Sequence, residues 1–467
     1  MIKKALTILL AFIGYTAHAT ITLPALFGNN MVLQQQADAA IWGTAKANAT
    51  VTIITSWDKK KYTIRANAAG SWKTTVRTPK AGGPYDITLS DGELLKLSNV
   101  LIGEVWICSG QSNMEMPVKG FKNQPILGAD DMLLEADDTA IHLFRLERAF
   151  TKTPQTDVKA KWEMVSPQSA KEFSAVGYNF ARILRQRLKV PIGIIQTTWG
   201  GTPIEAWMDT ASLKQVEGVK YPAANAAMTK NDPSVLFNAM IAPLVGYEMK
   251  GVLWYQGESN RLQPEIYAKL IQAMVGEWRT LWNKGNWPFY FVQIAPYQYP
   301  NVRELVPYLR EAQDKAQALI PNSGMAVCMD AGDQRTIHPA NKMIVSKRLA
   351  YWALAKTYGR DGIVYQGPVY KSLAIVADTA KVAFSNAPNG LTTYGKDLVN
   401  FEIAGSDKVF YTAKAKITND GLFLFSPQVK GPVAVRYAFK DWPEGELFNT
   451  DGLPAAPFRT DDWEAKK

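Results

Sequence analysis

The middle of the chain alternates short apolar runs with longer stretches of helical periodicity, and this alternation restricts the fold more than any other feature. Runs typical of buried strands occur at 105–108, 191–196, 252–255, 289–294 and 325–329. Between them, apolar residues recur at helical spacing over 176–188, 267–282 and 310–319. Strands that alternate with helices pair in parallel and are buried on both faces. The pattern therefore predicts an α/β unit with a mainly parallel sheet.

The segments on either side of this unit have strand character. Residues 20–100 alternate apolar and polar side chains in short runs separated by Gly-Pro and Gly-Gly, which predicts a small antiparallel sandwich. Near the other end, Asn-Asp-Gly at 419–421 between two strand-like runs is a strong hairpin signal. We therefore predict an N-terminal β domain over 20–100, a catalytic α/β domain over 101–361 and a C-terminal β-rich region over 362–467.

The first residues have the pattern of an export signal. Lys3 and Lys4 precede an apolar run, and Ala-His-Ala at 17–19 supplies the small residues that signal peptidase requires. The apolar run is too short to span the roughly 30 Å of a bilayer core, which argues against a membrane anchor. We therefore expect a signal peptide over 1–19, cleavage before Thr20, and a secreted or periplasmic protein without a membrane segment.

Charge and cysteine content argue against two kinds of partner. The formal charge of +10 falls to +8 when Lys3 and Lys4 are removed, and the remaining basic residues are scattered, unlike those of a nucleic-acid interface. Cys108 and Cys328 either pair or remain as buried thiols, and neither has a histidine or cysteine at ligand spacing. We expect no metal, no cofactor and no nucleic-acid partner, although a mild positive field suits an acidic sugar.

Four of the predicted strands are followed by small, polar and catalytic residue types. In open parallel sheets, ligands bind at the carboxyl ends of the strands, so these turns are expected to meet at one edge. They comprise residues 109–114, 197–202, 256–260 and 330–339. Each turn alone has the composition of an ordinary loop, but the four together predict an active site.

A serine and a histidine stand out among these turns. A serine nucleophile needs an imidazole base, because an unassisted hydroxyl is protonated at neutral pH. His142 lies in an apolar, strand-like segment that indicates a structural role, whereas His338 lies in a polar loop before a helix. Ser112 follows a strand, and its spacing to Glu115 is also that of a helix cap, which is compatible with catalysis. We predict Ser112 as nucleophile and His338 as general base.

The tetrahedral intermediate of acyl transfer also needs N–H donors for its oxyanion. The backbone of Ser112 supplies one, and Gly200 or Gly201 offers a second because glycine allows close backbone approach. The side-chain amide of Gln256 offers a third. Taken alone, the Gly-Gly pair is equally well interpreted as a simple turn.

These segments resemble the sequence blocks of the sialate O-acetylesterase-like family of SGNH hydrolases. The matching residues are Gly-Gln-Ser-Asn-Met at 110–114, Gly-Gly-Thr at 200–202, Trp-Tyr-Gln-Gly-Glu at 254–258, Asp-Ala-Gly-Asp at 330–333 and Ile-His-Pro at 337–339. The resemblance implies a flavodoxin-like three-layer catalytic domain with β domains attached. It also implies metal-independent hydrolysis of O-acetyl esters on sugars through an acyl-serine, with the roles given above and Asn260 as a weaker oxyanion donor.

The sequence departs from the family pattern at the acid of the triad. Many SGNH enzymes place this acid three residues before the histidine, where this chain has Arg335. An acid orients the imidazole and stabilises its charged form. Asp333 is the first candidate and Asp330 the second, and a backbone carbonyl that orients His338 is the alternative.

The functional prediction is therefore a carbohydrate O-acetylesterase that acts on an acetylated carbohydrate, with acetylated sialic acid as the family's namesake substrate. Within the same chemistry, the alternative is an esterase of acetylated xylan or another polysaccharide. From a different class, the alternative is a non-catalytic carbohydrate-binding protein, which would leave the convergence of Ser112, Gln256 and His338 unexplained. The oligomeric state stays open.

Overall fold

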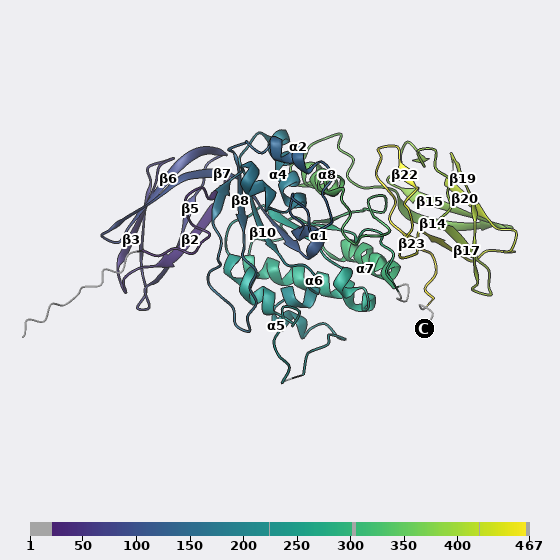
Figure 1. Ribbon diagram of the computed structural model, residues 1–467, viewed down its shortest axis with the longest axis horizontal. Coiled ribbons are helices and arrows are strands. Elements are labelled where there is room, and N and C mark those ends of the chain that lie inside the picture. The colour runs from purple at the N-terminus through teal and green to yellow at the C-terminus, as the bar shows by residue number, and fades with distance from the viewer. Residues whose placement is uncertain (1–20, 224, 301–304, 420, 464–467) are drawn as a thin grey trace, which may run out of the picture.

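The protein consists of a central α/β unit with β sheets at both ends (Figure 1). Its computed structural model describes residues 21–463 apart from 224, 301–304 and 420. The predicted signal peptide over 1–19 and the cleavage site before Thr20 lie outside the described residues. Within the described range, no helix combines the length and apolar character needed to cross a membrane.

The central sheet has the strand order β13-β12-β11-β7-β10-β8-β9. Its strands are β7 (Leu94–Gly110), β8 (Ile141–Arg145), β9 (Trp162–Met164), β10 (Ile192–Thr198), β11 (Gly251–Tyr255), β12 (Phe289–Val292) and β13 (Ser323–Ala326). All neighbours pair in parallel except β8 with β9. Every residue of β10, β11 and β12 is buried, which explains the apolar runs at 192–195, 251–255 and 289–292. The predicted, mainly parallel sheet is confirmed.

Helices cover both faces of this sheet. Along β11, Leu253 and Tyr255 belong to the apolar cluster of α4 (Ala175–Leu188) and α8 (Lys342–Trp352). The alternate residues Val252 and Trp254 belong to the cluster of α6 (Pro264–Trp282) and α7 (Val306–Leu319). Figure 1 shows α6 and α7 together on one side of the sheet. The alternation follows from the two-residue period of a strand, which sends successive side chains to opposite faces.

Shorter helical segments lie in the connections. They are α1 (Ser112–Glu115), α2 (Ala129–Leu134), α3 (Pro167–Lys171), α5 (Thr210–Leu213), η1 (Ile204–Trp207), η2 (Phe237–Ile241), η3 (Ala242–Leu244), η4 (Glu258–Asn260) and η5 (Ala353–Thr357). Two of them, α1 and η4, directly follow the carboxyl ends of β7 and β11, which are neighbours in the sheet.

The N-terminal region is β structure, as predicted, and it is continuous with the central sheet. Its strands are β1 (Val32–Gln34), β2 (Asp38–Thr44), β3 (Thr50–Thr55), β4 (Lys61–Arg65), β5 (Ser71–Arg77) and β6 (Gly82–Ser90). β2 pairs with β5, whereas β6 pairs with the first half of β7. Because β7 runs for 17 residues, the boundary expected at residue 100 falls inside one strand. One apolar cluster joins Val51 and Trp72 to Trp254 of the central sheet.

The C-terminal region is also β structure, with its own core. Its strands are β14 (Val369–Val376), β15 (Thr379–Ser385), β16 (Leu391–Thr392), β17 (Phe401–Ala404), β18 (Phe410–Thr412), β19 (Lys414–Thr418), β20 (Gly421–Phe425), β21 (Ala434–Tyr437), β22 (Phe448–Asn449) and β23 (Phe458–Arg459). The hairpin predicted around 419–421 joins β19 and β20, which pair antiparallel. The buried Arg310 of α7 donates to the carbonyls of Lys440 and Asp441 and thereby ties this region to the central unit.

Candidate active site

Ser112 lies where the central strand β7 turns into the one-turn helix α1. The turn requires glycine at position 110, because φ there is +131° and an added Cβ would come within 2.2 Å of the Tyr255 carbonyl oxygen. The close passage of the chain against β11 therefore aims the following serine out of the carboxyl edge of the sheet. Ser112 is half-buried at this edge.

His338 reaches Ser112 from the loop that precedes α8. Its Nε2 lies 2.7 Å from Ser112 Oγ, and its Nδ1 lies 2.6 Å from Gln124 Oε1. An amide oxygen only accepts hydrogen bonds, so Nδ1 carries the hydrogen and Nε2 is left to accept the serine proton. The ring of Phe121 packs edge-on against the imidazole at 5.3 Å between centroids. The predicted nucleophile and base are thus brought into hydrogen-bond contact.

The surroundings keep this imidazole neutral. Burial, followed by the positive charge of Lys342, lowers the pKa of His338 from 6.5 to about 4. Burial also lowers the pKa of the Lys342 ammonium from 10.5 to about 7. At neutral pH His338 is therefore in the form that accepts a proton, as a general base requires.

Asn113, the residue after the nucleophile, fastens α1 to the histidine loop. Its Nδ2 donates to Glu258 Oε1 at 2.6 Å and to the carbonyl of Ile337 at 3.0 Å, and its Oδ1 accepts from the Lys342 ammonium. Asn113, Glu258 and Lys342 are all buried, and burial raises the pKa of the Glu258 carboxyl. The network holds the loop directly before His338, and no sequence motif indicated this role.

Of the predicted oxyanion donors, the glycine pair lies beside the nucleophile. A Cβ added to Gly200 would lie 3.1 Å from Ser112 Cβ, closer than an ordinary van der Waals contact, so glycine favours this approach. The Gly200 N–H donates to Glu115 Oε2 at 2.8 Å, and Glu115 Oε1 accepts from Arg148 at 2.7 Å. Within the part of the chain that the structure describes, the backbone N–H groups of Ser112 and Gly201 have no intramolecular acceptor. These two N–H groups are therefore free to donate to an acceptor that is not part of the chain.

The side chains of Gln256 and Asn260 bind the segment after the glycine pair, at 202–205, so their amides are not free to donate to an oxyanion. Gln256 is fully buried, and its Nε2 donates to the Thr202 carbonyl at 3.1 Å and to Asn260 Oδ1 at 2.7 Å. Asn260 in turn donates to Glu205 Oε2 at 2.8 Å and accepts from the Ile204 N–H at 2.9 Å. Both amides are engaged in fixing the loop that carries the glycine pair.

The carboxylates of the two candidate acids, Asp333 and Asp330, bind groups other than His338. Asp333 Oδ1 accepts from the backbone N–H groups of Arg335 at 2.7 Å and Thr336 at 3.1 Å, which shapes the loop. Asp330 forms a two-pronged ion pair with Arg348 at 2.6 and 2.8 Å. The position beside His338 Nδ1 is filled by Gln124, which belongs to an irregular segment 214 residues away in sequence. No pattern around residue 124 marked it for this position.

The other residues singled out in the sequence lie apart from the reacting atoms. His142 is buried in β8, and its ring nitrogens contact the carbonyl oxygens of Asn30 at 2.5 Å and Thr139 at 3.1 Å. Burial lowers its pKa, which suits a neutral, structural ring. Cys108 and Cys328 are buried free thiols, so they do not pair. No group of three or more metal-ligating side chains occurs among the described residues.

Comparison with known proteins gives this arrangement its context. Residues 102–350 match the family model described as carbohydrate esterase, sialic acid-specific acetylesterase. Sialate O-acetylesterases from Rattus norvegicus and Homo sapiens are 31% and 30% identical to the chain, over 92% of it and over 92% and 90% of their own lengths.

A solved structure extends the likeness to three dimensions. The crystal structure of a carbohydrate acetylesterase from Xanthomonas citri matches with a TM-score of 0.87 at 37% identity, covering 95% of this chain and 100% of that one. The shared features include the central unit and the β regions on both sides, because so little of either chain is left out. The protein is a carbohydrate O-acetylesterase and belongs to the carbohydrate esterase family of sialic acid-specific acetylesterases.

Proposed function

We propose that the enzyme removes acetyl groups from O-acetylated sialic acid through a covalent acyl-serine at Ser112, within a catalytic domain of the SGNH three-layer type. The observation that carries the proposal is the 2.7 Å contact between His338 Nε2 and Ser112 Oγ at the carboxyl edge of a parallel sheet. The sialate O-acetylesterases that resemble this chain over nine-tenths of its length support the choice of substrate.

In the first half of the reaction, His338 Nε2 takes the proton as Ser112 Oγ attacks the acetyl carbonyl carbon. The negative charge that develops on the carbonyl oxygen is stabilised by the backbone N–H groups of Ser112 and of the glycine pair, Gly200 or Gly201. Because Gly200 already donates to Glu115, Gly201 is the better placed of the two. The intermediate then collapses, and His338 returns the proton to the departing sugar oxygen.

In the second half, a water molecule replaces the sugar. His338 accepts one of its protons as the water oxygen attacks the acyl-serine carbonyl, and the same N–H groups stabilise the second tetrahedral intermediate. Collapse breaks the bond to Ser112 Oγ, which regains its proton from His338, and releases acetate. Apart from the substrate and one water molecule, every group named in these steps belongs to this chain.

Gln124 takes the orienting position that Asp333 was expected to hold. Its side-chain oxygen accepts from His338 Nδ1 and so selects the tautomer in which Nε2 is basic. An amide carries no charge, so it stabilises the imidazolium of the transition state less than a carboxylate would. We propose that Asp333 instead shapes the histidine loop, and that the amide of Gln256 fixes the glycine loop.

We also propose that residues 1–19 direct export, so that the enzyme works as a secreted or periplasmic protein. The basic start, the short apolar run and the Ala-His-Ala site support this. A catalytic unit over 101–361 with β units on either side remains the proposed division into domains.

One other substrate class competes with this proposal. The relative from Xanthomonas citri is 37% identical and is described only as a carbohydrate acetylesterase, so a carbohydrate other than sialic acid, such as acetylated xylan, is the alternative substrate.

The test is acetate release from O-acetylated sialic acid, acetylated xylan and p-nitrophenyl acetate, with wild type and Ser112→Ala compared. We expect wild-type turnover of sialate and at least a thousandfold loss in the variant, because the nucleophile is removed, with an unchanged thermal midpoint. Serine-dependent release from xylan alone would move the substrate to the polysaccharide. Equal rates for the two proteins would refute the acyl-serine mechanism.

A further inference from the structure

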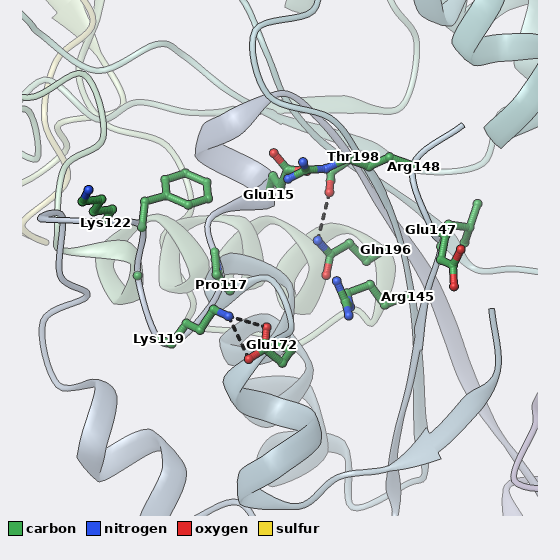
Figure 2. A pocket seen from close by; sticks show the side chains of 13 residues that line it. Glu115, Pro117, Lys119, Lys122, Arg145, Glu147, Arg148, Glu172, Gln196 and Thr198 are labelled. Atoms are coloured by element: carbon green, nitrogen blue, oxygen red, sulfur yellow. Dashed lines mark hydrogen bonds and ion pairs between the residues drawn. The ribbon is translucent and has the colours of Figure 1, made fainter. Parts of the chain in front are cut away.

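A cavity of about 570 Å³ adjoins the catalytic pair. Two of its lining residues contact the catalytic machinery, since Glu115 accepts from the Gly200 N–H and Phe121 packs against the His338 ring. Figure 2 shows other parts of the wall, among them Arg145 and Gln196 from the ends of β8 and β10, and Lys119 and Lys122 from the segment after α1. A substrate whose acetyl group lies at Ser112 would extend into this cavity.

The cavity is rich in charge, and most of that charge is already neutralised. Lys119 pairs with Glu172 at 2.7 Å, and Arg148 pairs with Glu115 at 2.7 Å, so these four side chains offer little net field. Lys122 and Arg145 also line the cavity, and within the described range neither side chain has an ion-pair partner. The cavity also contains the carboxylate of Glu147, which likewise has no ion-pair partner among the described residues and partly offsets the two positive charges.

Arg145 is held at a definite distance from the nucleophile. It is the last residue of β8 and lies opposite Gln196 of β10, which lies opposite Cys108 of β7. Neighbouring strands are about 4.8 Å apart, so the Cα of Arg145 is roughly 10 Å across the sheet from that of Cys108, four residues before Ser112. Arg145 lines the same cavity as Glu115, which bonds to Gly200 beside the nucleophile, so a sugar acid in this cavity has a guanidinium within its walls.

We propose that Arg145 forms a subsite for the carboxylate of an O-acetylated acidic sugar, and that Lys122, which lines the same cavity, adds to its positive charge. The proposal rests on the proposed esterase function and names its substrate class. A guanidinium matches a carboxylate with two parallel N–H donors, which makes it a better anchor than a point charge. Sialic acid and a uronic acid unit share this chemistry, whereas neutral xylose lacks it.

The test compares kcat/KM for acetate release from matched probes. The acidic probes are 9-O-acetyl-N-acetylneuraminic acid and O-acetylated galacturonic acid, and the neutral probe is the carboxamide of the same acetylated sialic acid. In Arg145→Gln we expect the ratio of sialate to carboxamide to fall about tenfold, since a hydrogen-bonded ion pair is lost. In Arg145→Lys the ratio should lie between those of wild type and Arg145→Gln, because lysine keeps the positive charge but lacks the two parallel N–H donors of the guanidinium.

Two further variants distinguish an effect of charge inside the cavity from an effect of the protein's overall charge. Glu147→Gln removes the cavity's unpaired carboxylate and should raise the ratio about twofold. Arg187→Gln removes an exposed charge at the far end of α4, next to the amino ends of the strands, and should leave the ratio unchanged. Thermal midpoints of all variants identify any that fail to fold.

The outcomes separate the subsite from the esterase function. Equal kcat/KM for sialate and carboxamide in wild type, or an unchanged ratio in Arg145→Gln, overturns the subsite while the esterase stands. Absence of Ser112-dependent acetate from every probe refutes the esterase itself. Where the ratio falls as expected, a matching loss of kcat/KM for the galacturonate probe in Arg145→Gln shows that the subsite also serves a uronic acid, and no loss shows that it serves sialic acid alone.

Discussion

Replacement of Gln124 tests the most unusual contact of the active site. In Gln124→Ala the 2.6 Å hydrogen bond to His338 Nδ1 is lost, and with it the group that selects the productive tautomer. A hydrogen bond to a group that becomes charged in the transition state contributes about 1.5 to 3 kcal/mol, so kcat should fall about 10- to 100-fold. KM should change little, because the bond strengthens only as the imidazolium forms.

Gln124→Glu provides the matched variant, since the side chain keeps its shape and gains a charge. A carboxylate at this position favours the imidazolium, which raises the pKa of His338 from the value of about 4 set by burial and Lys342. A protonated histidine cannot act as a base, so wild-type kcat/KM should decline only as pH falls through about 4. In the variant the same decline should begin at a higher pH.

The assay is acetate release across the pH range for the three proteins, with thermal midpoints as a folding control. An alanine variant with wild-type kcat would show that the imidazole is oriented by another group. A glutamate variant whose acid limb coincides with that of wild type would show that residue 124 does not face the histidine in solution.

Two further predictions concern groups around the same histidine. Lys342→Met removes the buried ammonium that lowers the pKa of His338, so the acid limb of kcat/KM should move to higher pH; an unmoved limb, in a variant shown to be folded, would refute that electrostatic contribution. Asp333→Asn keeps an oxygen for the Arg335 and Thr336 N–H groups, so we expect a change in kcat of less than about threefold. A hundredfold loss in steady-state kcat would instead identify Asp333 as the acid of the triad.

The chemistry-bearing blocks can be found in the sequence because each lies within a few residues of a strand end. Parallel strands collect their carboxyl ends at one edge, so the strand pattern alone predicts that Ser112, Gly200 and His338 meet there. Orientation within each block is harder to predict. Gln256 and Asn260 have the chemistry of oxyanion donors, yet their amides bond to Thr202 and Glu205.

The amino-acid pattern by itself determined the parallel sheet, the β regions on both sides and the serine–histidine pair, since these follow from local periodicity and from short motifs. Only the tertiary structure decided what surrounds the pair. Gln124 meets His338 across 214 residues through irregular segments, and Asn113 of α1 meets Lys342 of α8 across 229 residues. No periodicity in the sequence encodes either contact. The same holds at residue 100, where β7 continues through the expected boundary because both halves of the strand find partners. Contacts of this kind depend on how loops pack against one another, which is a property of the assembled fold.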